Sequence, residues 1–200
     1  MKRARHSIRA GCYDYTWPGM YFVTTCAHER RMLFGEIQDD KVKLSEVGRV
    51  IREEWLRTPQ VRAAVELDEF VVMPNHFHAI VIFTHTALVG AHCVRPASPQ
   101  PRPNDGGARS APLRPAQSLG SLVAGFKSAV THRCGQPVWQ RNYFEHIIRD
   151  EHGLEKIGDY IASNPFRWSL DRENPQRRGV DEFDRWLVGA HCVRPVRRQT

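Results

Sequence analysis

The sequence contains no apolar run long enough to cross a membrane or to form the core of a signal peptide. Its first six residues, MKRARH, are basic, but no such run follows them. We therefore expect a soluble, cytoplasmic protein without a membrane partner. The sequence also lacks a GxxxxGKS/T loop, so nothing in it predicts a nucleoside triphosphate site.

Cysteine is scarce, and its spacing excludes the common structural zinc sites. None of the cysteines belongs to a CxxC or CxxH pair, and their odd number and wide spacing fit a reduced compartment rather than a disulfide framework. The five residues are Cys12, Cys26, Cys93, Cys134 and Cys192.

The charge balance favours a polyanionic partner. The 200 residues are enough for one domain with a sizeable core, and they carry a formal net charge of +7 with a pI near 9.5. Lysine and arginine near phosphates gain affinity by releasing condensed counterions, so nucleic acid is the first candidate. Charge alone does not decide this, because many small basic proteins bind no specific polyanion.

The hydrophobic pattern predicts an α+β domain. β-branched and aromatic runs predict strands, and apolar residues at helical spacing between capping residues and prolines predict helices. The expected order is strand, helix, two strands joined by the Pro74-Asn75 turn, helix, strand and a last helix, in segments 21–27, 45–59, 66–73, 76–83, 119–135, 138–144 and 151–163. This order predicts a ferredoxin-like antiparallel sheet with helices on one face, plus a C-terminal helix.

Changes in composition along the chain predict its division into a central domain and flanking segments. We expect a basic N-terminal arm (1–20), a domain (21–168) with a proline-rich insertion (85–115), and a loosely ordered, arginine-rich C-terminal tail (169–200). The nonamer LVGAHCVRP occurs at both 88–96 and 187–195. Its His-Cys pair is a poor metal site without further ligands, so we interpret the repeat as duplicated coding DNA.

Two histidines occur two residues apart on the predicted strand 76–83. Alternate residues of a strand point to the same face, so His76 and His78 present neighbouring imidazoles while Phe77 packs on the other face. An isolated His-x-His can be a plain surface pair. Its position within a strongly apolar strand favours a site for a divalent cation.

Tyr160 and Asn164 are four residues apart on the last predicted helix and therefore share one of its faces. A tyrosine can attack phosphorus, and an amide oxygen one turn away can complete a three-ligand metal site with the histidine pair. From spacing alone, a core tyrosine and a helix C-cap before Pro165 explain the pair better than a catalytic site does.

Four segments in the right order resemble the REP-associated tyrosine transposases, which are one-tyrosine HUH enzymes that act on single-stranded DNA. They are VVMPNHFHAI (71–80), SLGSLVAGFKS (118–128), VWQRNYFEHIIR (138–149) and DYIASNP (159–165). The resemblance covers residues 21–168 and implies the HUH endonuclease fold. It makes His76 and His78 metal ligands, Tyr160 the nucleophile, and Asn164 the third ligand, where relatives often have glutamine.

The resemblance implies a reaction and a substrate. With Mg²⁺ or Mn²⁺ as cofactor, the enzyme would cut palindromic-repeat DNA hairpins through a 5′-phosphotyrosine and rejoin the strand, acting as a monomer or homodimer on single-stranded or hairpin DNA. Tyr143 is a rival nucleophile that we assign instead to packing or base stacking. Further candidates for DNA contact or for supporting the site are Lys127, Trp139, Arg141, Tyr143, Glu145, His146 and Arg149.

Two other functions remain open. A relaxase or replication-initiator HUH nuclease shares the histidine pair but usually has additional domains, and a domesticated hairpin-binding protein would no longer cut. The basic segments that could hold DNA are 2–9, 102–114 and 194–198.

Overall fold

The computed structural model describes residues 18–84 and 118–191, and its centre is a four-stranded antiparallel sheet. The strands are β1 (Gly19–Cys26), β4 (Val65–Val72), β5 (His76–Phe83) and β6 (Phe144–Ile148). Their order in the sheet is β4-β5-β1-β6, with every neighbouring pair antiparallel. This is the ferredoxin-like connection of two split β-α-β units, so the predicted fold class is confirmed.

One face of the sheet is covered by α1 (Glu46–Leu56), the single-turn α2 (Thr58–Val61) and α3 (Leu119–Cys134). Local sequence sets the helix ends. The Ser45 side chain accepts the Gly48 N–H as an N-cap, and Gly135 ends α3 in the left-handed region at φ 64°. Trp55 packs edge-on against Phe77 of β5, and both rings contact Phe126 of α3.

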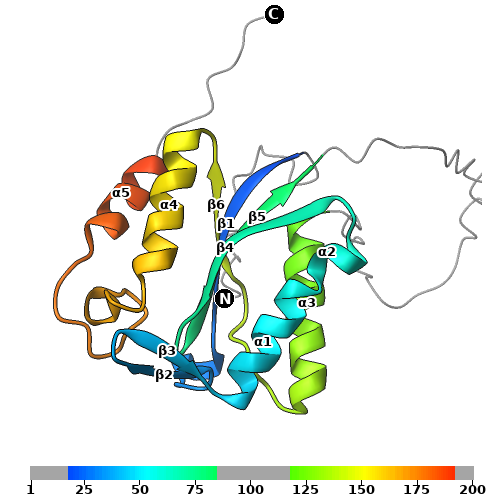
Figure 1. Cartoon of the computed structure of the whole chain (residues 1–200), viewed down its shortest axis with the longest axis horizontal. Helices are drawn as coiled ribbons and strands as arrows, with labels where there is room; N and C mark the ends of the chain where they lie inside the picture. Colours follow the sequence, from blue (N-terminus) through cyan, green and yellow to red (C-terminus); the bar gives the residue numbers. More distant parts are fainter. Residues whose placement is uncertain (1–17, 85–117, 192–200) are drawn as a thin grey trace, which may run out of the picture.

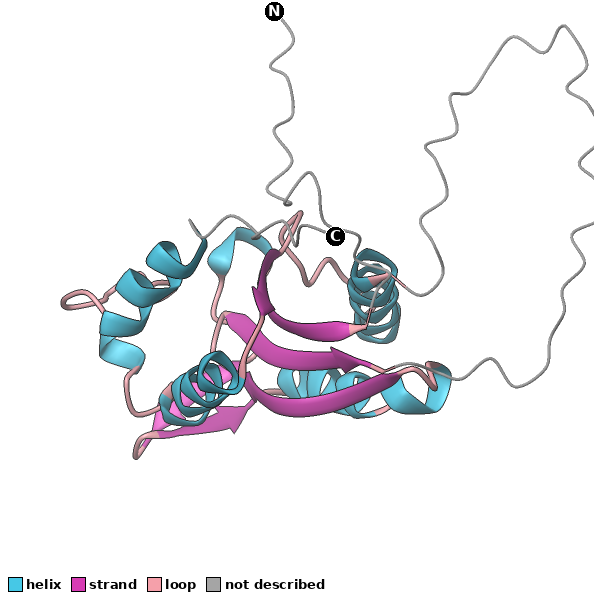
Figure 2. Cartoon of the chain, turned by 90° about the horizontal axis from the view of Figure 1, so that it is seen from above, coloured by secondary structure: helices cyan, strands magenta, loops and turns pink. Residues whose placement is uncertain are grey.

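The opposite face is covered by α4 (Glu151–Ser163) and α5 (Glu182–His191), so helices lie on both sides of the sheet (Figures 1 and 2). A smaller core forms there around Phe22, Ile80 and Ile161, all buried. The helices α1 and α3 thus share one face as predicted. The predicted C-terminal helix, α4, lies on the other face together with α5.

The register of β5 decides which face each of its side chains enters. Thr24 of β1 pairs with His78, and Phe22 pairs with Ile80. Because strand residues alternate, His76 and His78 point toward α4 while Phe77 points into the core beneath α1 and α3. Both histidines are almost fully buried.

Some elements differ from the sequence prediction. The last strand begins at Phe144 rather than near Val138, because residues 138–143 form a loop in which Trp139 makes only an isolated bridge with Ala27. A two-stranded hairpin, β2 (Gly35–Gln38) and β3 (Lys41–Leu44), was not predicted, nor were the 3-10 turns η1 (His28–Arg30) and η2 (Trp168–Leu170). These elements are three or four residues long, too short for a clear hydrophobic period.

The expectation of a loosely ordered tail after Trp168 is wrong for residues 169–191. Phe183 and Leu187 of α5 are buried against α4, and Trp186 packs beside them. Asp181 accepts the Phe183 N–H and pairs with Arg167, which fixes the start of α5. Residues 1–17, 85–117 and 192–200, with most of the N-terminal arm, the insertion and the first copy of the nonamer, lie outside the described residues.

No helix among residues 18–84 and 118–191 has the length and apolar character needed to span a bilayer.

Substitution of Phe183 tests whether α5 belongs to the core. Phe183→Ala removes a ring that is 4% exposed, so we expect the free energy of unfolding to fall by about 3 kcal/mol. Val180→Ala, at a side chain that is 49% exposed, should change it by less than about 0.5 kcal/mol. Urea denaturation measures both, and equal small effects would show that α5 is not packed in solution.

Candidate active site

The histidine pair lies at the start of β5 and is held by hydrogen bonds on the Nδ1 side of each ring. The His78 Nδ1 is 2.8 Å from the Thr24 hydroxyl, and the His76 Nδ1 is 2.9 Å from the Asn75 Oδ1. An amide oxygen only accepts, so His76 carries its proton on Nδ1. Its Nε2 lone pair is then free to bind a ligand, and the ring centroids of the two histidines are 4.4 Å apart.

Helix α4 brings Tyr160 and Asn164 to the same place. The Tyr160 hydroxyl lies 3.4 Å from the His78 Nε2 and donates a hydrogen bond to Asp171 Oδ2 at 3.2 Å. The Asn164 Nδ2 donates to the same Asp171 oxygen at 3.0 Å. The two elements identified separately in the sequence, the histidine strand and the Tyr160 helix face, therefore meet in space.

Asp171 is the residue that sequence reasoning missed. It directly follows η2, is 2% exposed, and its Oδ2 lies 3.7 Å from the His76 Nε2. It shares neither a strand nor a helix with the other site residues, so no periodicity links it to them. The only signal in the sequence is an acidic residue shortly after the Tyr160 helix, and many surface loops have one.

The ligand atoms of His76, His78 and Asp171 all lie within 4.8 Å of one another, and this buried group could hold a metal ion. Two further observations fit a cation. The His76 Nε2 and the Asn164 Oδ1 are both buried, and neither has a hydrogen-bond partner among the described residues. A cluster of imidazole nitrogens and carboxylate and amide oxygens, which present lone pairs rather than protons, suits Mg²⁺, Mn²⁺ or a borderline transition metal.

Burial keeps both imidazoles neutral. Desolvation, together with the nearby Arg30, lowers the pKa of His76 to about 3. Desolvation and the neighbouring His76 also hold the pKa of His78 well below its usual value, although Asp171 opposes this. The 3.7 Å approach of His76 to Asp171 is therefore no ion pair, and both rings keep a lone pair for a metal.

The phenol of Tyr160 is held in its protonated form. Burial raises its pKa, and the carboxylates of Asp171 and Asp184 raise it further. The ring stacks on Phe183 with centroids 3.7 Å apart and planes 8° from parallel, which leaves it 5% exposed. Without a cation nearby, this hydroxyl is a poor nucleophile.

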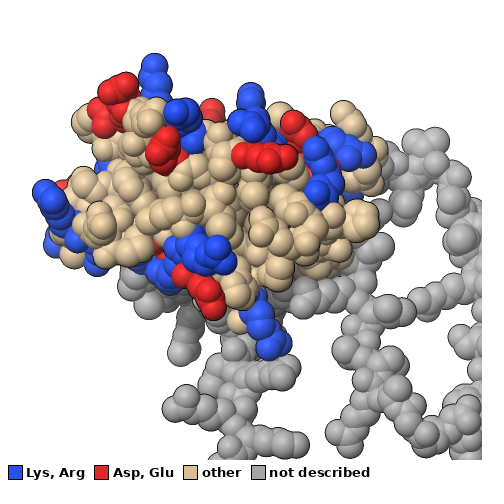
Figure 3. Space-filling model, turned by 90° about the horizontal axis from the view of Figure 1, so that it is seen from below, with Lys and Arg blue, Asp and Glu red and all other residues tan. Residues whose placement is uncertain are grey.

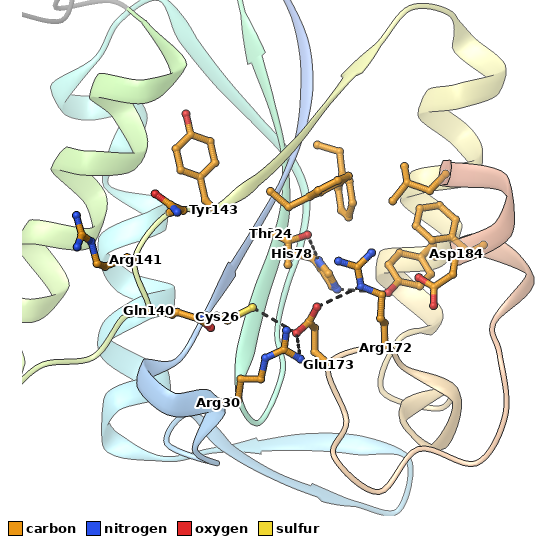
Figure 4. Close-up of a pocket in the computed structure, with 16 residues that line it drawn as sticks. Thr24, Cys26, Arg30, His78, Gln140, Arg141, Tyr143, Arg172, Glu173 and Asp184 are labelled. Atoms are coloured by element: carbon orange, nitrogen blue, oxygen red, sulfur yellow. Dashed lines mark hydrogen bonds and ion pairs between the residues drawn. The ribbon is translucent and has the colours of Figure 1, made fainter. Parts of the chain in front are cut away.

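A pocket of about 370 Å³ opens beside this cluster, with His78, Tyr160 and Thr24 in its lining. Gln140, Arg141 and Tyr143, from the loop before β6, lie on one side of it, and Arg172 and Asp184 lie on the other (Figure 4). The Tyr143 side chain points away from His78, although it also lines the pocket.

The other predicted residues are spread around the fold. Trp139 is buried in the core against Phe34 and Phe126, so it serves packing rather than base stacking. The Lys127 ammonium donates to the backbone oxygens of Gln140 and Asn142 at 2.6 and 2.8 Å and so fixes the loop beside the pocket.

The three remaining candidates lie on or directly after β6. Glu145 pairs with Val23, so its side chain enters the sheet face opposite the histidines. His146 faces α5, with its ring 6.0 Å from that of Trp186, and Arg149 is exposed. None of these three lines the pocket.

Positive charge is distributed unevenly along the chain. Eleven of the 29 lysines and arginines, but only two of the 22 acidic residues, lie in segments 1–17, 85–117 and 192–200, so the described residues carry 18 basic and 20 acidic side chains. Basic and acidic residues are interspersed over the face shown in Figure 3. The net charge of +7 therefore comes from the segments that contain the three basic stretches named above.

The chain is similar to an uncharacterized protein of Haemophilus influenzae (strain ATCC 51907 / DSM 11121 / KW20 / Rd). The two are 36% identical over 174 residues, which cover 84% of this chain and 92% of that protein. The chain belongs to the same family as this protein. No protein-family model matches it.

A solved structure of a REP-associated tyrosine transposase bound to a REP hairpin is 21% identical to the chain. It has a TM-score of 0.49, and the match covers 84% of this chain and 74% of that one. A likeness this distant does not decide function.

Acidification of the metal-free protein tests the neutral state of the histidine pair. Below about pH 6.5 the unfolded chain protonates both residues and the folded chain does not, so stability is lost as the pH falls from there toward 3. We expect each histidine to contribute a loss of up to about 1.4 kcal/mol per pH unit.

Urea titrations between pH 7 and 5 in EDTA measure this slope. The matched control replaces both residues, as His76→Gln with His78→Gln, and should lose that part of the slope while the other histidines keep theirs. An identical slope in the two proteins would show that the pair takes up protons alike in the folded and the unfolded chain, so that folding does not lower its pKa values.

Proposed function

We propose that this protein is a metal-dependent endonuclease and strand transferase that acts on single-stranded DNA, with Tyr160 as its nucleophile. One observation carries the proposal: the Tyr160 hydroxyl lies 3.4 Å from the His78 Nε2, at the edge of a buried group of metal ligands. A tyrosine beside a metal site and a pocket is the arrangement needed to attack a phosphodiester.

The proposed metal is Mg²⁺ or Mn²⁺, with His76, His78 and Asp171 as ligands and Asn164 as a further one through its buried Oδ1. When bound, the ion would supply Lewis-acid polarisation of the scissile phosphate and positive charge that favours the phenolate. Asp171 has a second role, because it accepts a hydrogen bond from the Tyr160 hydroxyl and thereby orients the phenol.

In the proposed reaction the Tyr160 Oη attacks phosphorus, and the bond between phosphorus and the 3′ oxygen breaks. The phenol loses its proton, the departing 3′ oxygen gains one, and the 5′ end stays attached as a phosphotyrosine. Attack by another 3′ hydroxyl reverses these steps and joins a strand without ATP, because the phosphotyrosine keeps the energy of the original bond.

The proposed substrate is a palindromic repeat folded as a hairpin, in agreement with the resemblance of four segments to the REP-associated transposases. Arg141 and Arg172, on opposite sides of the pocket, are suited to phosphate contacts, and both are exposed. The pocket is also lined by Phe144, whose half-buried ring could stack on an unpaired base.

One observation favours a second candidate, a hairpin-binding protein that does not cut. Tyr160 is stacked under Phe183, and its pKa is raised by burial and then by two neighbouring carboxylates. Such a phenol could be a core residue with a satisfied hydroxyl. The two candidates differ in whether a covalent product forms.

An adduct assay distinguishes them. Full-length protein is incubated with Mn²⁺ and labelled single-stranded hairpin DNA from the flanks of its own gene, and denaturing electrophoresis detects any protein–DNA adduct. We expect an adduct with the wild type and a loss of at least about 100-fold in Tyr160→Phe, because the phenylalanine has no nucleophilic oxygen.

Tyr143→Phe is the matched control, since it removes the same atom from the rival tyrosine, and it should retain the adduct. An adduct that persists in Tyr160→Phe and disappears in Tyr143→Phe would reverse the assignment. Hairpin binding without any adduct would support the non-cutting protein.

A further inference from the structure

Asp171 lies in a segment with little regular structure, between η2 and α5, yet its carboxylate must stay against His76 to complete the ligand group. The segment needs an attachment to the sheet. Glu173, two residues later, is 7% exposed at its side chain and provides this attachment.

Glu173 makes contacts with both its backbone and its carboxylate. Its N–H donates to Asp171 Oδ1 at 2.6 Å, which holds the oxygen that does not face the histidines. Its Oε2 lies 2.8 Å from Arg30 Nη1 and accepts the Cys26 thiol at 3.5 Å. Its Oε1 is 3.4 Å from the Arg172 Nε, and Figure 4 shows these contacts converging on Glu173 from different elements.

Asn75 joins this segment to the histidines. Its Nδ2 donates to the Glu173 backbone oxygen at 2.8 Å and to the Arg30 backbone oxygen at 3.3 Å, while its Oδ1 accepts from His76. Backbone oxygens cannot donate, so the amide orientation is fixed. A single buried side chain thus sets the His76 tautomer and anchors the backbone that carries Asp171.

The backbone around Arg30 is strained in a way that fits this network. Glu29 and Arg30 have φ values of 55° and 54°, in the left-handed region that non-glycine residues rarely adopt. Such strain persists only where surrounding contacts enforce it. Here the contacts are the hydrogen bond from Asn75 to the Arg30 oxygen and the ion pair with Glu173.

We propose that Glu173, Arg30 and Asn75 are positioning residues that hold Asp171 in the metal-ligand group. The inference rests on the proposed function only in requiring that this group bind a divalent cation. In this proposal the ion pair between Arg30 and Glu173 holds Asp171 in place. Neither the histidine strand nor the Tyr160 helix does so. Loss of that pair should release Asp171 and weaken metal binding while the sheet stays folded.

Calorimetric titration of the EDTA-treated, full-length protein with Mn²⁺ tests the inference. We expect Glu173→Gln and Arg30→Met each to weaken Mn²⁺ binding by about tenfold, as losses of groups that orient metal ligands typically do. The double variant should be little weaker than either single one, because the two residues act as a pair. Arg30 is half exposed, so its variant is expected to fold even if Glu173→Gln does not.

Asp181→Asn is the matched control. Asp181 is also a buried carboxylate in the same C-terminal segment and pairs with Arg167 at 2.6 Å, but it fixes α5 and not Asp171. This variant should lower the melting temperature in EDTA and leave Mn²⁺ affinity within about twofold of the wild type. A merely structural role for Glu173 would give both variants the same pattern.

Three results would overturn the inference: wild-type Mn²⁺ affinity in Glu173→Gln and Arg30→Met, equal weakening in Asp181→Asn, or no Mn²⁺ binding by the wild type. Its failure can be told apart from that of the proposed function. Adduct formation together with unchanged Mn²⁺ affinity in Glu173→Gln would support the proposed nuclease and contradict the positioning role. Weakened Mn²⁺ binding in the Glu173→Gln and Arg30→Met variants, with no DNA adduct in the wild type, would support the positioning role and contradict the proposed nuclease.

Discussion

The pairing of β1 with β5 fixes which way the side chains of β5 point, and the rest of the site depends on it. Phe77 enters the core beneath α1 and α3, while His76 and His78 on either side of it face α4. A shift of one residue would exchange the faces, burying the imidazoles among aromatic rings and turning Phe77 toward Tyr160. The aromatic packing of Phe77 with Trp55 and Phe126 therefore also holds the histidines in place.

The site brings several hydrogen-bond acceptors together in a buried position, where proteins rarely leave acceptors unsatisfied. Two neutral imidazoles, a carboxylate and an amide oxygen meet under nearly complete burial. Within residues 18–84 and 118–191, the His76 Nε2 and the Asn164 Oδ1 have no hydrogen-bond partner. Leaving such atoms unsatisfied costs about 1–3 kcal/mol each. A divalent cation would satisfy them together, and the same charge would reverse the effect of Asp171 and Asp184 on the Tyr160 phenol. Cation binding and nucleophile activation are thus one electrostatic event in this account.

The sequence predicted those parts of the fold and the site that have a local period. The strand 76–83 and the helix 151–163 agree with β5 and α4, because alternation and helical spacing are strong in both. The meeting of Tyr160 with His78 was an expectation from motif resemblance, and in the structure the two side chains are in contact.

The parts that sequence reasoning missed depend on how a loop or turn runs in three dimensions, and no regular spacing of apolar residues marks them in the sequence. Asp171 and Glu173 reach the histidines through a turn. Helix α5 is short, and the arginines around it mask the apolar spacing of Phe183, Trp186 and Leu187. The loop at 138–143 resembled a strand because Val138 and Trp139 are apolar, although they enter the core from a loop.

The central claim is that the histidine strand, the Tyr160 helix and the Asp171 turn share one metal ion. Anomalous diffraction from crystals of the full-length protein soaked in Mn²⁺ tests it most directly. The account predicts one strong peak at bonding distance from the Nε2 atoms of His76 and His78 and from Asp171 Oδ2, adjacent to the Tyr160 hydroxyl. A peak that contacts only exposed carboxylates, or no peak between β5 and α4, would contradict it.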